Sequence, residues 1–239
     1  MISTVASIEL RWGRGFETPD QKSVVKPFVK TAIELAHDGL GTAGIPLARK
    51  KRVVVDQVDP KNKKFGETNS ESARLFVKSS QVARGKLDAI KMAGTIFHEM
   101  VHSSRFETNG YLENMFDLAA HEGVAYVAEN QFNIDLFSTH GRIYNRRSHI
   151  DRVREVTGTD DFEQLRSAFI EDCSSGDPWT DALYHRWFGI SMYKPTKFYP
   201  GKGAFIGIAA VLEQVDAGRD VAEMVSLPAL EVLGFAAWQ

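Results

Sequence analysis

The order of the hydrophobic patterns along the chain limits the fold more than any other feature. Strands are expected at residues 5–12, where apolar and polar residues alternate weakly, at 52–58, which has the apolar run of a buried strand, and at 73–79. One helix is expected among them over residues 22–37. From about residue 85 onward, apolar residues recur at helical spacing. Strands that come early and helices that come late predict an α+β fold, because a parallel sheet covered by helices on both faces needs the two to alternate throughout.

The rest of the chain predicts a series of helices. They are expected at residues 86–105, 112–135, 146–156, 160–172, 180–190 and 203–217, with a short segment at 220–233. No internal repeat, low-complexity tract or long linker interrupts this series. We therefore expect a single domain over residues 1–239, with an α/β part over 1–84 and a helical part over 85–239.

Composition excludes several classes of protein. The 29 basic and 31 acidic side chains give a formal net charge of −2, which provides no electrostatic attraction to nucleic acid or to an anionic membrane. The N-terminal residues lack the pattern of a signal peptide, and no apolar run approaches the roughly 18 residues of a membrane span. The single cysteine, Cys173, excludes an internal disulfide and a zinc site built from thiolates. We expect a cytoplasmic protein whose partner is neither a membrane nor nucleic acid.

The most informative motif lies in the helix expected over residues 86–105. It is His98-Glu99-Met100-Val101-His102, an HExxH pattern. Histidines four residues apart lie on one helical face with their Cβ atoms about 5–6 Å apart, so both rings can bind one metal ion. The glutamate between them would point at the metal-bound water and take a proton from it.

A helical wheel shows how the two histidines lie on this helix. They share a face with Lys91, Thr95 and Arg105, away from the main apolar stripe. Such a position suits ligands that line a cleft. The alternative is an ordinary amphipathic helix with two solvent-exposed histidines.

A catalytic zinc site needs a third protein ligand and an open position for water. The segment LAAHEGVAYVAEN, about twenty residues after the motif, offers His121 and Glu122. On a helical wheel Glu122 shares a face with apolar residues, whereas His121 lies about 100° away on the wetter side. A buried carboxylate without a partner is costly, so a metal ion is the simplest partner for Glu122. A buried ion pair between Glu122 and Arg105 is the alternative, and Glu129 could orient a ligand or form a structural pair.

These residues match a known family pattern. An HExxH motif followed after nineteen residues by a glutamate in the context Glu-Gly-x-Ala-x-x-x-Glu resembles the gluzincin clan of zinc metallopeptidases. The segment FYPGKGAFIGIAAVLEQVDAGRDVAEMVSLPALEVL is similar to the C-terminal region of the YjaZ-like family of predicted bacterial Zn-dependent proteases. The resemblance covers about residues 85–235. It implies one catalytic Zn²⁺ on His98, His102 and Glu122, with Glu99 as general base and a peptide or protein as substrate.

The same resemblance implies a zincin-like architecture. A small, mainly antiparallel sheet near the N-terminus would pack on the zinc-binding helix, and a mostly helical part would follow. The strand at residues 73–79, ARLFVKS, would be the edge strand to which an extended peptide could add.

The sequence departs from the family pattern at the group that would stabilise an oxyanion. Ala204 and Ile208 stand where the resemblance leads us to expect tyrosines beside the glycines of a small-residue helix. Tyr199 and His185 are the candidates to replace them. A packing role for Tyr199 and a surface position for His185 are the alternatives.

Two further hypotheses follow from the same residues. In the first, the protein is a DNA-associated zinc protease of the SprT type, with His121 as third ligand and basic segments at residues 49–52 and 142–154 that bind DNA. In the second, it is an inert zincin-fold binding module. Glu99 argues against the second hypothesis, because a binding module does not need a general base.

Overall fold

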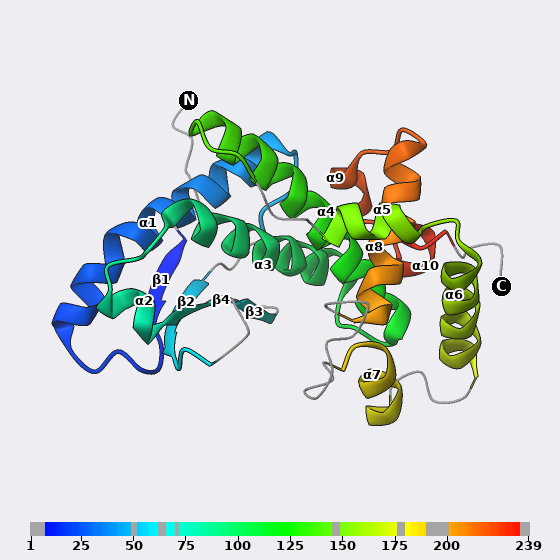
Figure 1. Ribbon diagram of the computed structural model, residues 1–239, viewed down its shortest axis with the longest axis horizontal. Helices are drawn as coiled ribbons and strands as arrows, with labels where there is room; N and C mark the ends of the chain where they lie inside the picture. The colour runs from blue at the N-terminus through cyan, green and yellow to red at the C-terminus, as the bar shows by residue number, and fades with distance from the viewer. Residues whose placement is uncertain are drawn as a thin grey trace. The chain divides into compact units, whose positions relative to one another are not determined.

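The computed structural model describes residues 8–48, 52–61, 66–69, 72–144, 149–175, 180–189 and 201–234 (Figure 1). These residues form four strands and ten helices: β1 (Glu9–Trp12), α1 (Pro19–Thr42), β2 (Arg52–Val58), β3 (Gly66–Asn69), β4 (Ser72–Lys78), α2 (Ser79–Ala83), α3 (Ala89–Asn109), α4 (Met115–Thr139), α5 (His149–Val156), α6 (Asp160–Ser174), α7 (Asp181–Trp187), α8 (Lys202–Asp216), α9 (Val221–Met224) and α10 (Ala229–Val232). The α+β class expected from the sequence is confirmed.

Contacts within the chain define two compact units. One comprises residues 1–107 and 132–142 and contains the sheet, α1, α2, most of α3 and the last turns of α4. The other comprises residues 108–131 and 143–239 and contains the first part of α4 and the helices from α5 to α10. None of the helices in the described ranges is long and apolar enough to span a lipid bilayer.

The four-stranded sheet has the order β1-β2-β4-β3. β1 pairs with β2 and β2 pairs with β4 in parallel, whereas only β3 and β4 are antiparallel. The expectation of a mainly antiparallel sheet was therefore wrong. The reason lies in the connection from β1 to β2, where the long helix α1 crosses over and so joins strands that run in the same direction.

The edge strand is also different from the one expected. β4, which corresponds to the predicted ARLFVKS strand, lies inside the sheet between β2 and β3. The outer position next to it belongs to β3, whose sequence GETN has none of the apolar alternation that reveals a strand. Antiparallel pairing with β4 places β3 there, with Gly66 opposite Leu75 and Thr68 opposite Ala73.

One face of the sheet is buried. Alternate residues of the two central strands are buried on it: Val53, Val55, Ala73, Leu75 and Val77. Because Gly66 and Thr68 lie opposite Leu75 and Ala73, they belong to this same face. Helix α3 lies over this face of the sheet (Figure 1). At β3, the Thr68 hydroxyl lies 3.2 Å from the Glu99 carbonyl oxygen of α3.

Helix α1 extends past residue 37, where its end was expected. It begins at Pro19, because the Thr18 hydroxyl accepts a hydrogen bond from the backbone N–H of Gln21, and it continues to Thr42. At Gly39, a Cβ atom would come within 2.5 Å of the Phe132 ring. Gly39 therefore allows α4 to pack closely against α1 and does not terminate the helix.

The second unit is held together by a close approach of α4 and α8. A Cβ atom at Gly207 would lie 2.7 Å from the carbonyl carbon of Ala119 and nearer still to its oxygen. A Cβ at Gly123 would lie 3.1 Å from the Cα atom of Gly207. The two helices thus meet backbone to backbone, which only glycine at the crossing permits.

Cys173 of α6 is buried, as expected for a small apolar residue. Burial raises the pKa of its thiol to about 12, with a further contribution from the neighbouring Asp172 carboxylate. We expect the native thiol to react with a disulfide reagent at pH 8 more slowly than the unfolded chain by a factor on the order of 10³, since only the thiolate is nucleophilic. Absorbance of the released thiolate in native buffer and in denaturant measures this ratio, and equal rates would contradict it.

Candidate metal centre

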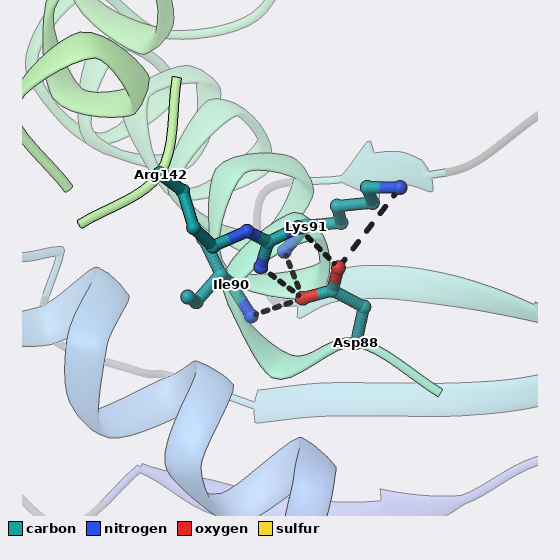
Figure 2. Close-up of polar contacts among 4 residues, drawn as sticks. All are labelled: Asp88, Ile90, Lys91 and Arg142. Carbon is teal, nitrogen blue, oxygen red and sulfur yellow. Dashed lines mark hydrogen bonds and ion pairs between the residues drawn. The ribbon is translucent and has the colours of Figure 1, made fainter. Parts of the chain in front are cut away.

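The N-terminus of α3 is fixed by a carboxylate. Asp88 accepts hydrogen bonds from the backbone N–H groups of Ile90 and Lys91, at 3.1 and 3.4 Å, and so caps the helix that carries the HExxH motif (Figure 2). Arg142 donates two hydrogen bonds to the same carboxylate, at 3.1 and 2.8 Å. Because Arg142 follows α4, this pair ties the end of α4 to the start of α3.

Further along, α3 and α4 pack closely. The rings of Phe97 and Phe132 are stacked with centroids 4.3 Å apart. A Cβ atom at Gly94 would lie 3.0 Å from the amide nitrogen of Asn133 and nearer to its oxygen, so the helix surface there fits only a glycine. Because Phe97 directly precedes His98, these contacts fix the rotation of α3 about its axis and thus the direction in which the motif residues point.

The ionised Asp88 cap should make the stability of the protein depend on pH. Hydrogen bonds from Arg142 hold the pKa of the Asp88 carboxyl below its usual range, although partial burial opposes them. A lowered folded-state pKa means that ionised Asp88 stabilises the fold at neutral pH, and that this contribution is lost as the pH falls below about 4 and through the folded-state value. Asp88→Asn keeps a capping side chain without the charge, so its unfolding temperature should be lower than that of the wild type at pH 7, and the difference should become smaller as the pH is lowered to 3.

The control for this experiment is Asp38→Asn. The Asp38 side chain is 81% exposed, and its substitution should leave the unfolding temperature nearly unchanged at both pH values. A difference between Asp88→Asn and the wild type that is as large at pH 3 as at pH 7 would contradict the role given to the charge.

His98 and His102 are both buried, with 9% and 6% of their surfaces exposed. Their Nε2 atoms lie 3.1 Å apart, and their rings are inclined by 77°. The alternative of two solvent-exposed histidines is therefore excluded. The face that the helical wheel left without apolar neighbours is covered by protein, and Arg105, one turn beyond His102, is 1% exposed.

Glu122 of α4 completes a group with the two histidines. One Glu122 carboxylate oxygen and one ring nitrogen of each histidine all lie within 4.8 Å of one another. His121 is not a member of this group, and it is 3% exposed, so its expected position on a wet side of the helix was wrong. The wheel argument failed because α4 is buried almost all round here. Among residues 119–125 only Glu122, which was expected on the buried face, is partly exposed.

The geometry of the group fits a zinc ion. Two imidazole nitrogens bound to one tetrahedral ion at 2.0–2.1 Å are about 3.3 Å apart, close to the 3.1 Å between His98 and His102. Two imidazoles and one carboxylate are also the ligands of a catalytic zinc site that keeps a fourth position open. Mg²⁺ and Ca²⁺ prefer oxygen ligands, so this donor set suits them less well.

Glu99 lies between the two histidines in sequence and is 8% exposed. The edge strand β3 contacts Glu99. The Glu99 carboxylate lies next to Gly66, and the Thr68 hydroxyl is 3.2 Å from the Glu99 carbonyl oxygen. Thr68 also lies 3.1 Å from the hydroxyl of Ser103, which donates to the same carbonyl. The sequence did not predict β3 or the contacts of Gly66 and Thr68 with α3, because both residues lie in a polar segment without periodicity.

The remaining candidates lie elsewhere or outside the described residues. His185 is exposed in the last turn of α7, with its ring 5.9 Å from that of Tyr184. Tyr199 falls outside the described residues. Arg142, in the basic segment considered for DNA binding, is bound to Asp88.

Comparison of the chain with protein families, with curated proteins and with solved structures found no match.

Proposed function

We propose that this protein is a zinc-dependent metallopeptidase of zincin-like architecture, with His98, His102 and Glu122 as ligands and Glu99 as general base. The observation that carries the proposal is the His-His-Glu group, whose donor atoms lie within 4.8 Å of one another. A buried glutamate one residue after the first histidine adds the one group that hydrolysis needs and metal storage does not.

The chain's own residues supply orientation and proton transfer. When bound, a zinc ion acidifies a coordinated water and polarises the carbonyl of the substrate. Glu99 accepts the proton of the attacking water and returns it to the leaving amine. The edge position of β3 next to Glu99 is where an extended peptide could add as a further strand, so that its backbone is held beside the base.

The proposal is tested on the purified protein. We expect about one zinc ion per chain by elemental analysis, and hydrolysis of an unstructured protein such as casein that stops with a chelator and returns with added Zn²⁺. A protein that binds no zinc would contradict the metal site. A zinc-loaded protein that cleaves neither casein nor a mixed peptide library would contradict the peptidase assignment.

The third ligand is tested by substitutions at two adjacent residues. Glu122→Gln should weaken zinc binding by more than about 10²-fold, since loss of a direct ligand costs more than the 10–100-fold typical of residues that merely orient ligands. His121→Gln, the matched control, should leave zinc affinity within about threefold. Competition with a chromophoric chelator measures both values. If zinc is lost from His121→Gln and retained by Glu122→Gln, the third ligand is His121.

A further inference from the structure

We propose that Gly66, on the edge strand β3, is a positioning residue that leaves room for the Glu99 carboxylate to act as general base. The inference rests on the proposed function, because Glu99 has a reaction to serve only in a hydrolase. It assigns a role to a strand that no motif in the sequence reveals.

The space at Gly66 is taken up by Glu99. A Cβ atom at Gly66 would lie 2.9 Å from Cγ of Glu99 and closer still to its Oε1, and 2.8 Å from the methyl carbon of Thr95. Contacts below 3.0 Å are essentially never made by real Cβ atoms. Any residue other than glycine must therefore displace Glu99, Thr95 or the strand itself.

Backbone conformation does not explain the glycine. Gly66 is not among the described glycines with positive φ, and it pairs with Leu75 as part of a regular antiparallel ladder. An L-residue could adopt this backbone without strain, and glycine in a strand interior normally weakens the strand. A glycine in an extended strand often marks a close approach by another group, and here that group is the carboxylate.

The strand is not free to retreat from α3. Thr68, two residues further along β3, contacts the Glu99 carbonyl oxygen and the Ser103 hydroxyl, and its hydroxyl also lies 3.2 Å from the carbonyl oxygen of Ser72. With β3 held to both α3 and β4, the end of the flexible Glu99 side chain is the part that moves most easily. A side chain at position 66 would therefore change the fold little and move the base.

The test is Gly66→Ala. We expect kcat for peptide hydrolysis to fall about 10²-fold, the loss typical of a catalytic group misplaced by about 1 Å, with a smaller change in KM and unchanged zinc stoichiometry. Gly41→Ala, the matched control, makes the same change in α1 where a Cβ would meet nothing within 4 Å, and should leave all three values unchanged. Wild-type kcat in Gly66→Ala would overturn the proposal.

A crystal structure of zinc-loaded Gly66→Ala gives a readout that does not depend on activity. The Glu99 carboxylate should be displaced, while the imidazoles of His98 and His102 keep their positions. A carboxylate in its original place would overturn the inference, as would recovery of kcat when Thr95→Ser removes the methyl group in the Gly66→Ala protein. If the wild type binds zinc and proves inactive, the proposed function fails, whereas an active wild type with an equally active Gly66→Ala overturns only the inference.

Discussion

Glu99→Gln is expected to lower kcat for peptide hydrolysis by about 10³-fold while leaving one zinc ion bound. Glutamine keeps the shape and burial of the side chain but cannot accept a proton from water, and general acid–base groups contribute typically 10²–10⁴-fold to rate. The ligands His98, His102 and Glu122 are untouched. The expected result is thus a folded, metal-loaded and nearly inactive protein.

The measurement combines steady-state kinetics on a fluorogenic peptide with elemental analysis of the same sample. Glu34→Gln, an identical change at an exposed position of α1, is the control and should retain full activity. Turnover by Glu99→Gln within tenfold of the wild type would remove Glu99 as the base. Loss of zinc from Glu99→Gln would instead show that this side chain belongs to the metal-binding group.

Gly207→Val is expected to destabilise the second unit by about 3 kcal/mol or more, the upper range for overpacking a well-packed interface. The added atoms would meet the backbone of Ala119, which cannot rotate away as a side chain can. Since residue 119 lies in the same helix as Glu122, zinc affinity should fall along with stability.

Chemical denaturation followed by circular dichroism gives the free energy of unfolding for this comparison. Gly41→Val provides the matched control, because position 41 faces open space in helix α1 and tolerates a side chain at a cost set only by helix propensity. Equal stability of Gly207→Val and Gly41→Val would show that α4 and α8 can separate without cost, contrary to the packing described above.

The positions of most long elements could be predicted from local pattern. The strands β2 and β4 and the helices α3, α4, α6 and α8 match the expected segments within a few residues. The ends of helices differed where tertiary packing mattered more than the local sequence. Helix α1, for example, continues through Gly39, where the absence of a side chain leaves room for the Phe132 ring. β3 was missed because its four residues depend on pairing with β4 and not on any periodicity of their own.

For the candidate site, the sequence by itself determined the spacing of His98, Glu99 and His102, because a helical repeat of 3.6 residues fixes which side chains share a face. It could not determine what lies opposite that face. The tertiary structure decided that Glu122 and not His121 joins the two histidines, and that Gly66 of an edge strand lies against Glu99. The physical reason is that helical periodicity sets directions within one element, whereas the partners in those directions come from segments distant in the sequence, placed by the packing of the whole chain.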